Sequence, residues 1–280
     1  MGYTWQLALT AVFVEGLIFI AMSFFGVREA IIKSIPKNIK TAVSVGIGLF
    51  IAFIGLQNAG IVANNDATLV GLGAVTKGPA LVALIGLVIM GVLLAFKVKG
   101  ALLIGIIATT IVGIPFGVTT IPKGWSPVSA PAAPLFFQFQ FDKIFTLDFV
   151  VVMFTFLFVD IFDTIGTLVG VTTQAGLINK NGDIPKVKQA LLADAIGTVA
   201  GAALGTSTVT SYVESASGVA EGGRTGLTSL TTGLLFGLAL FLSPLFLLVP
   251  GAATAPALIL VGLFMLSPVK ELDQIGRAHV

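Results

Sequence analysis

The sequence lacks cysteine altogether and contains a single histidine, His279. Without cysteine, the chain has no disulfide bonds, thiolate metal sites or thiol nucleophiles. His279 lies in the last six residues, which we expect to be a non-native tail, so the chain offers no candidate histidine for a Ser-His-Asp triad or a metal site. Rossmann and phosphate-loop fingerprints are also missing. We therefore predict no catalytic residues, no metal site and no bound cofactor.

Charged residues are scarce as well, since they make up 10% of the chain and leave a formal net charge of +2. So small a charge gives no indication of a nucleic-acid partner. Hydrophobic residues make up 56% of the 280 residues, which is too many for a water-soluble globule of this size. The composition therefore predicts a membrane protein, with the lipid bilayer as its surroundings.

Apolar segments long enough to cross a bilayer recur along the chain. They are residues 5–25, 39–58, 80–96, 100–117, 146–171, 186–205, 225–249 and 252–267. A transmembrane β-barrel would instead show shorter segments in which apolar and polar residues alternate. We therefore predict an all-α polytopic membrane protein.

One further stretch, "GTSTVTSYVESASGVAEGG" at 205–223, is too polar and too rich in glycine for an ordinary span. We interpret it as a broken crossing, with an extended piece over Thr206–Tyr212 and a short helix from about Val213. Irregular backbone is tolerated at membrane depth only where protein or a water-filled cavity surrounds it. In transporters, the half-helix at such a break directs N–H groups at a polar substrate. The alternative is a re-entrant or surface loop without function.

Lysine and arginine fall mainly on one side of the membrane if the broken crossing is counted. This side holds Arg28, Lys33, Lys37, Lys40, Lys97, Lys99, Lys180, Lys186, Lys188, Arg224 and Lys270, and the other holds Lys77, Lys123 and Lys143. By the positive-inside rule the first group is cytoplasmic. We therefore predict a multi-pass protein of the cytoplasmic membrane, with Lys180–Lys188 inside and Val118–Phe145 outside.

This orientation places residue 1 outside, yet Met1–Gln6 offers no signal peptide or charged flank to carry it there. The last residues, "IGRAHV" at 275–280, match sequencing-adapter read-through, so we expect them to be a non-native tail. We therefore expect the sequence to be a fragment of a longer protein, and we expect this fragment alone to be unable to transport.

Weak internal matches recur at a nearly constant spacing. "GLIF" at 16–19 returns as "GLLF" at 233–236, and "GLF" at 48–50 returns at 262–264. Seven predicted crossings separate the paired segments, and an odd number reverses the direction through the membrane. The pattern therefore predicts an inverted repeat, as in many secondary transporters.

The stretch "FVDIFDTIGT" at 158–167 places two acids inside an apolar run. A carboxylate facing lipid there costs roughly 2.5–3.5 kcal/mol, so Asp160 and Asp163 are expected to face the helix bundle. They share a helix face with Thr164 and Thr167, and Gly166 permits close approach of a backbone or a ligand. We expect them to lie opposite the broken crossing, which carries Glu214.

A structural role is the alternative for both acids, since a buried carboxylate can cap a helix or bond a hydroxyl group. That alternative weighs more for Asp160 than for Asp163. For Glu15 and Asp194, two other acids in or near spans, a structural role is the preferred interpretation.

The motifs "VDIFDTIGTLVGV", "GTSTVTSYVESASGVAEGGRTGLTS", "IGLFIAFIGLQNAG" and "GYTWQ" resemble the AzgA-type branch of the nucleobase:cation symporter-2 family, the adenine, guanine and hypoxanthine permeases. The resemblance extends from residue 1 to about 273. It implies a seven-plus-seven inverted-repeat fold with core and gate domains that imports purine nucleobases with protons. It also implies that this sequence holds helices four to twelve of fourteen.

By this resemblance, Asp163 and Glu214 match the substrate-binding carboxylates of the family, and Asp160 is the alternative to Asp163. Asp163 and Glu214 are also the candidates for proton coupling, because burial disfavours the charged form of a carboxyl group. The remaining residues expected to line the substrate pocket are Thr164, Gly166, Thr167, Ser211, Val213 and Ser215. A carboxylate suits a purine because it accepts the N–H groups on the purine edge.

The resemblance also divides the chain into segments. Residues 1–26 are expected to form a core-domain helix, 27–145 gate-domain helices, 146–250 core-domain helices and 251–274 the start of a second gate segment. Residues 275–280 are the expected tail. The preferred ion, H⁺ or Na⁺, and the formation of a homodimer stay open.

Two other functions remain as alternatives. An anion transporter of the same architecture would require a basic residue near the break, and Arg224 is the one close by in the sequence. A membrane enzyme would require a nucleophile and a base, which the sequence does not offer. We therefore expect a purine importer rather than an enzyme.

Overall fold

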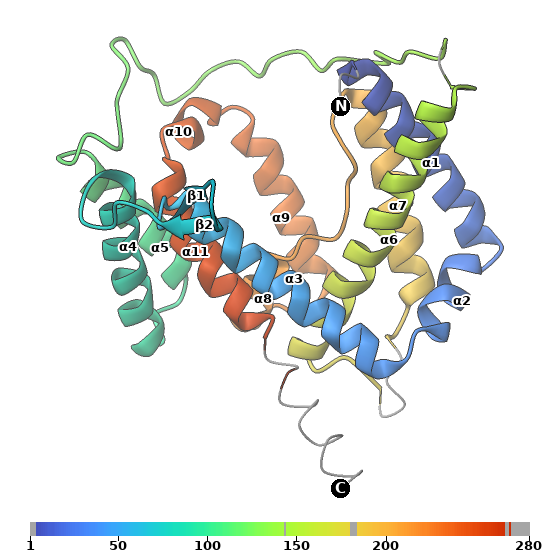
Figure 1. The fold of residues 1–280 in the computed structure, drawn as a ribbon, viewed down its shortest axis with the longest axis horizontal. Helices are drawn as coiled ribbons and strands as arrows, with labels where there is room; N and C mark the ends of the chain where they lie inside the picture. The colour runs from blue at the N-terminus through green and yellow to red at the C-terminus, as the bar shows by residue number, and fades with distance from the viewer. Residues whose placement is uncertain (1–3, 143, 180–183, 267–268, 270–280) are drawn as a thin grey trace, which may run out of the picture. The chain divides into compact units, whose positions relative to one another are not determined.

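The computed structural model describes residues 4–142, 144–179, 184–266 and 269. The expected tail at 275–280, with His279, and also Lys143, Lys180 and Lys270, lie outside the described residues. The described chain divides into two compact units (Figure 1). The first unit contains residues from 1–47 and 133–215, and the second contains residues from 48–132 and 216–267.

The first unit consists of helices. These are α1 (Trp5–Phe24), α2 (Val27–Ser34), the first half of α3 (Lys37–Asn58), α6 (Leu147–Gln174) and α7 (Val187–Leu204). Helix α1 packs against α6 and α7. The contact with α7 depends on Gly16, because a Cβ atom at that position would lie 2.7 Å from Val199 Cγ2. Small residues let apolar helices approach closely in this way.

Hydroxyl side chains cap the helices that frame this unit. The Thr4 hydroxyl accepts a hydrogen bond from Leu7 N at the start of α1, and Thr146 does the same for Phe149 N at the start of α6. Behind these caps, Leu7, Ala11 and Phe149 form a buried apolar cluster. The caps and the cluster together fix where α1 and α6 begin.

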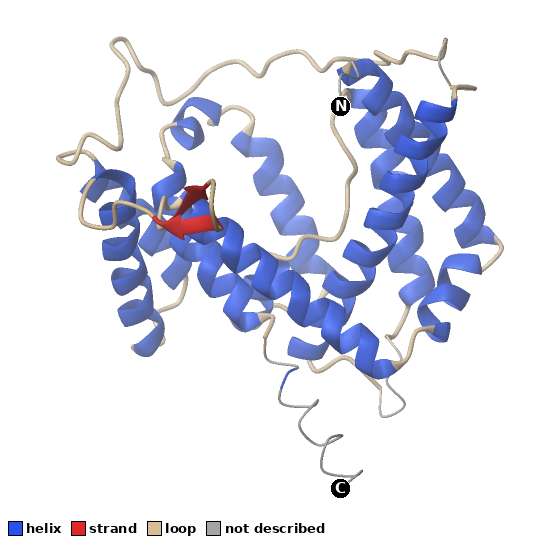
Figure 2. Ribbon diagram, viewed as in Figure 1, coloured by secondary structure: helices blue, strands red, loops and turns tan. Residues whose placement is uncertain are grey.

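The second unit contains the other half of α3 and a hairpin of β1 (Val62–Asn65) and β2 (Leu69–Leu72), shown in red in Figure 2. Its remaining helices are α4 (Gly78–Ala95), α5 (Ala101–Gly113), α8 (Ser215–Ala220), α9 (Gly226–Ala239), α10 (Ser243–Leu247) and α11 (Gly251–Phe264). Helix α11 packs against α4 and α5. It also crosses α3 closely, since a Cβ atom on Gly262 would lie 2.9 Å from Ala52 Cβ.

The predicted spans agree with the helices in most places and differ in three. Within the described residues, five helices are long and apolar enough to cross a membrane: α1, α3, α4, α6 and α7. The segments predicted at 100–117 and 252–267 form helices α5 and α11, of 13 and 14 residues. A helix of that length spans only about 20 Å, whereas the bilayer core is about 30 Å thick.

Proline explains two of these differences. Pro115 follows directly after Ile114, the C-cap of α5, and has no N–H group to continue the helical hydrogen bonds. The segment predicted as one span at 225–249 is interrupted after Ala239 and resumes as α10 with Pro244 in its first turn. Pro244 cannot donate a hydrogen bond to the preceding turn, so the helix restarts there.

The β-hairpin was not predicted from the sequence. Its strands pair antiparallel, with Val62 opposite Leu72 and Asn65 opposite Leu69. The Asn65 side chain closes the turn by accepting hydrogen bonds from Ala67 N and Thr68 N. Asparagine favours such turns because its side chain mimics a backbone acceptor.

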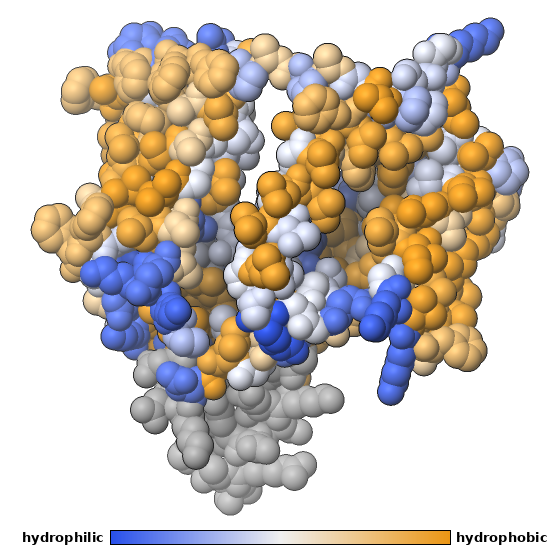
Figure 3. Space-filling model, turned by 180° about the vertical axis from the view of Figure 1, so that it is seen from behind, coloured by the Kyte–Doolittle hydropathy of each residue, from blue (hydrophilic) through white to orange (hydrophobic). Residues whose placement is uncertain are grey.

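Apolar side chains lie exposed along the helices, as expected for a protein in a bilayer. Figure 3 shows hydrophobic residues over most of the visible face, with hydrophilic residues gathered in smaller patches. Val88 in α4, Val151 in α6 and Leu227 in α9 are 66%, 57% and 69% exposed. A water-soluble monomer rarely exposes so many large apolar side chains. The structure therefore confirms a mainly helical membrane protein; the inverted repeat and the core and gate assignments remain predictions.

Candidate functional site

The predicted break in the crossing at 205–223 is confirmed. Helix α7 ends at Leu204, and Gly205 continues the chain with a φ of 93°, which glycine adopts readily. Residues 206–212 are not helical and run as a loop in the first unit before α8 begins at Ser215 (Figure 2). We refer to residues 206–212 as the extended segment.

Helix α7 holds the extended segment through side chains that bond to its backbone. The Thr198 hydroxyl donates to Val209 O at 2.9 Å and accepts from Val209 N at 3.3 Å. One turn earlier on α7, Asp194 Oδ1 accepts from Ser211 N at 3.1 Å. Backbone groups that leave a helix inside a membrane protein need partners of this kind. Asp194 and Thr198 therefore supply the hydrogen bonds that the missing helix would have made.

Helix α6 contacts the same segment from its polar face. Asp163 Oδ2 accepts from the Thr210 hydroxyl at 3.4 Å. The neighbouring Thr164 hydroxyl donates to Asp194 Oδ2 at 3.4 Å. Asp163, Thr164, Asp194, Thr210 and Ser211 thus come together in the first unit, and we call them the polar cluster.

Glu214 belongs to the same region. It is exposed in the turn before α8, and its charge acts on the Asp163 carboxyl group. Asp163 bonds to Thr210 of the extended segment, and Glu214 follows this segment in the chain. Both acids predicted to bind substrate therefore lie at the extended segment. Val213 is buried, and Ser215 is exposed at the start of α8.

Asp160 points to a different partner. It is 4% exposed, and its Oδ2 lies 3.6 Å from Arg28 Nη2, within ion-pair distance but too far for a hydrogen bond. The same guanidinium lies 3.3 Å from Asp194 Oδ2 and donates to Leu191 O at 3.0 Å. These contacts support the structural role for Asp160 over the substrate-binding role.

The sequence analysis counted Arg28 among the cytoplasmic positive charges and did not predict that its side chain is buried. It is 3% exposed, and its guanidinium lies 3.9 Å from the centre of the Phe19 ring. The burial is tolerated because two carboxylates and a carbonyl group pair with the guanidinium. Arg28 lies at the start of α2, directly after the turn that follows α1. The local sequence does not indicate its burial, because its acidic partners lie far away in the chain.

Two other predicted residues, Gly166 and Thr167, are buried in the bundle. A Cβ atom on Gly166 would lie 2.9 Å from Val43 Cγ1 of α3, so Gly166 serves the packing of α3 against α6. The Thr167 hydroxyl is buried and has no hydrogen-bond partner among the described residues. Neither Thr198 nor Thr210 was predicted as a site residue, although both are hydroxyl residues next to the predicted break.

A model of the xanthine and uracil permeases, described as the Permease family, matches residues 1–277. The chain belongs to this family. It is therefore a multi-pass membrane protein of a transporter family and not of an enzyme family.

Three curated relatives share a large part of this sequence. The chain is 46% identical over 269 residues to putative permease MJ0326 of Methanocaldococcus jannaschii, covering 96% of the chain and 62% of that protein. It is 47% identical over 271 residues to guanine/hypoxanthine permease PbuG of Bacillus subtilis, covering 96% and 61%. It is 41% identical over 275 residues to adenine permease AdeP of Escherichia coli, covering 98% and 61%. These relatives confirm the resemblance to purine permeases, and the chain spans about three fifths of their length.

A solved structure has a similar fold. The transmembrane domain of the cyanobacterial bicarbonate transporter BicA superposes with a TM-score of 0.65 at 18% identity, over 94% of this chain and 69% of that one. At this identity the similarity concerns the fold alone.

Proposed function

We propose that this protein takes part in the import of purine nucleobases, namely adenine, guanine or hypoxanthine, by proton symport. The observation that carries the proposal is the placement of Asp163 and Glu214 at the extended segment, with Asp163 bonded to Thr210. The relatives named as guanine/hypoxanthine and adenine permeases support the choice of purines.

The chemistry of the polar cluster suits a neutral purine. A purine edge presents N–H donors and ring-nitrogen acceptors, which match carboxylate oxygens and the hydroxyl and N–H donors of the extended segment. Helix α8 has only 6 residues, so its dipole adds little, and the recognition depends on the side chains of Asp163 and Glu214. Thr164 and Ser211 hold the segment through Asp194 and thereby fix where these two acids lie.

Asp163 can also bind the proton that is transported together with the purine. Its carboxylate accepts from Thr210 when ionised, and a protonated carboxyl group can donate instead to a purine ring nitrogen. The change from acceptor to donor would link the protonation of Asp163 to the binding of substrate. Asp160 would take no part, because Arg28 already engages it.

The anion alternative loses support at this cluster. Arg28 is a cation close to the extended segment, but Asp160 and Asp194 already pair with it. Glu15 is also buried in α1, and it adds no positive group for an anion. A transported anion would meet more acidic groups than basic ones here.

Uptake of labelled solutes would test the proposal. Cells that express the full-length protein containing this chain, and that lack their own purine permeases, should accumulate adenine, guanine or hypoxanthine when the outside is acidic. Uracil and bicarbonate in the same assay serve as comparison solutes. Accumulation of bicarbonate without any purine would contradict the proposal.

A further inference from the structure

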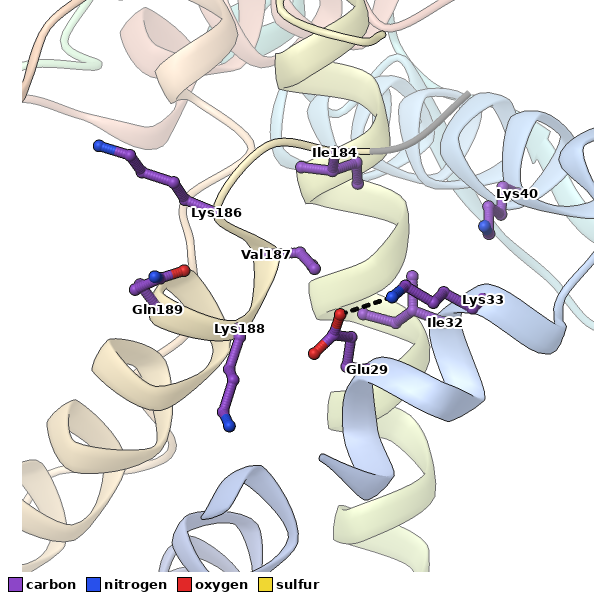
Figure 4. Close-up of a pocket in the computed structure, with 9 residues that line it drawn as sticks. All are labelled: Glu29, Ile32, Lys33, Lys40, Ile184, Lys186, Val187, Lys188 and Gln189. Atoms are coloured by element: carbon purple, nitrogen blue, oxygen red, sulfur yellow. Dashed lines mark ion pairs between the residues drawn. The ribbon is translucent and has the colours of Figure 1, made fainter. Parts of the chain in front are cut away.

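A second polar site lies in the first unit, lined by residues outside the polar cluster. It is a pocket of about 430 Å³ bordered by α2, the start of α3 and the start of α7 (Figure 4). Among the described residues that line it, four are lysines, namely Lys33, Lys40, Lys186 and Lys188, and one is an acid, Glu29. The pocket therefore carries a clear excess of positive charge at neutral pH.

The single acid is already engaged on one side of the pocket. Lys33 Nζ lies 2.7 Å from Glu29 Oε1, an ion pair between neighbouring turns of α2 drawn as a dashed line in Figure 4. The hydrogen bond from Lys33, followed by the charges of Lys33 and Lys188, lowers the pKa of Glu29. Lys188 belongs to α7, so lysines from two helices act on one carboxylate. Within the described residues, no ion pair joins Lys40, Lys186 or Lys188 to an acid.

The start of α7 adds backbone donors to the lysines. The pocket is lined by the first turn of α7, an 18-residue helix, through Val187, Lys188 and Gln189. Its N-cap, Lys186, has a φ of 56°, and no side chain caps the helix. The first N–H groups of a helix have no partner within the helix and carry the positive end of its dipole. Such a terminus, flanked by cations, suits an oxyanion.

We propose that this pocket binds a phosphate group, carried either by the headgroup of an anionic phospholipid or by free inorganic phosphate. Lysine ammonium groups and helix N–H groups are the donors that a phosphate accepts. The side chains of Ile32 and Val187 form an apolar wall beside the lysines. This proposal does not depend on the transported substrate, because no residue of the polar cluster lines the pocket.

Paired lysine substitutions provide the test, because the chain contains a matched control. The double variant Lys186→Gln with Lys188→Gln removes two charges from the pocket. The control, Lys97→Gln with Lys99→Gln, removes two charges at the same spacing from exposed positions that do not line it. Lys97 even shares the left-handed backbone of Lys186, with φ values of 54° and 56°. Any cost of substitution at that conformation is therefore common to both variants.

Binding of phosphatidylglycerol and of phosphatidylcholine to the purified protein, counted by native mass spectrometry, gives the lipid arm. We expect phosphatidylglycerol to bind more tightly, and the pocket variant to lose about 5- to 30-fold in that affinity, while the control stays within about twofold. Lys40→Gln, on α3, should lose about two- to fivefold, and it tests the site independently if the double variant folds poorly.

Calorimetric titration with inorganic phosphate, in detergent without phospholipid, gives the second arm. Pocket-dependent binding of phosphatidylglycerol that phosphate does not displace identifies a lipid headgroup. Pocket-dependent binding of phosphate, with both lipids bound alike, identifies free phosphate. The proposal would be overturned if the pocket and control variants lost the same affinity. It would also be overturned if neither phosphatidylglycerol nor inorganic phosphate showed binding that depends on the pocket.

Discussion

Asp160 and Asp163 lie three residues apart on the same helix and were indistinguishable by type, yet they have different surroundings. Asp160 is 4% exposed and pairs with Arg28, whereas Asp163 is half-buried and bonds to Thr210 of the extended segment. A spacing of three residues rotates the second side chain by about 60° around the helix axis, which is enough to change the facing element. One acid thus serves the packing of α2 against α6 and α7, and the other is available to a ligand.

The comparison predicts that the first acid's partner matters most for stability. Arg28→Met should lower the stability of the purified protein by about 3–5 kcal/mol, because Asp160 and Asp194 would be left buried without a cation. The control is Arg224→Met, since Arg224 is exposed and its guanidinium donates to carbonyl groups nearby in the chain. Thermal unfolding should show a large loss for Arg28 and almost none for Arg224. Equal unfolding temperatures would remove the structural role from the Arg28 network.

Glu214, which lies near Asp163, should matter most for the binding of purine. Glu214→Gln keeps the size of the side chain but sets an NH₂ group against an N–H donor of the purine, so affinity should fall roughly 5- to 150-fold. Glu221→Gln is the matched control, because Glu221 is an exposed acid whose Oε1 accepts from Gly100 N in the second unit. Equilibrium binding of labelled purine measures both variants. A loss of the same size at Glu221 would point to a general effect of charge.

The hydrogen bonds that hold the extended segment should have an intermediate effect. Thr198→Val leaves Val209 N and Val209 O without their partner, which should cost about 1–3 kcal/mol of stability. Thr110→Val removes a hydroxyl that donates to Ile106 O within its own helix, and it should cost less than about 1 kcal/mol. Unfolding temperatures of the two variants would compare them directly. If Thr110→Val were the more damaging, the extended segment would not depend on α7.

Sequence reasoning located the break and the acids because each violates a strong physical rule. A polar, glycine-rich stretch cannot be an ordinary span, and carboxylates such as Asp163 are too costly to face lipid. Sequence reasoning did not predict the burial of Arg28, because its partner Asp194 lies 166 residues further along the chain. A basic residue at the end of an apolar run is normally solvated, so nothing local distinguishes a buried one.

The hairpin and the interrupted helices were missed for a different reason. Strands β1 and β2 have four residues each, too short for a period of apolar residues to stand out. The turn at Asn65 and the prolines Pro115 and Pro244 were visible in the sequence, but the search for long apolar segments passed over them. Side-chain partners such as Thr198 and Val209 depend on how α7 meets the extended segment, which the spacing of residues does not specify.

The central claim is that Asp163 exchanges a proton during purine transport while Asp160 does not. Its most direct test places Asp163→Asn and Asp160→Asn in the full-length protein and compares their pH-driven purine uptake, with equilibrium binding measured on the same preparations. Because asparagine cannot change its protonation state, Asp163→Asn should keep purine binding within about tenfold and lose accumulation against a gradient. Asp160→Asn should keep both activities per folded molecule. Undiminished uphill uptake by Asp163→Asn, or its loss only in Asp160→Asn, would contradict the account.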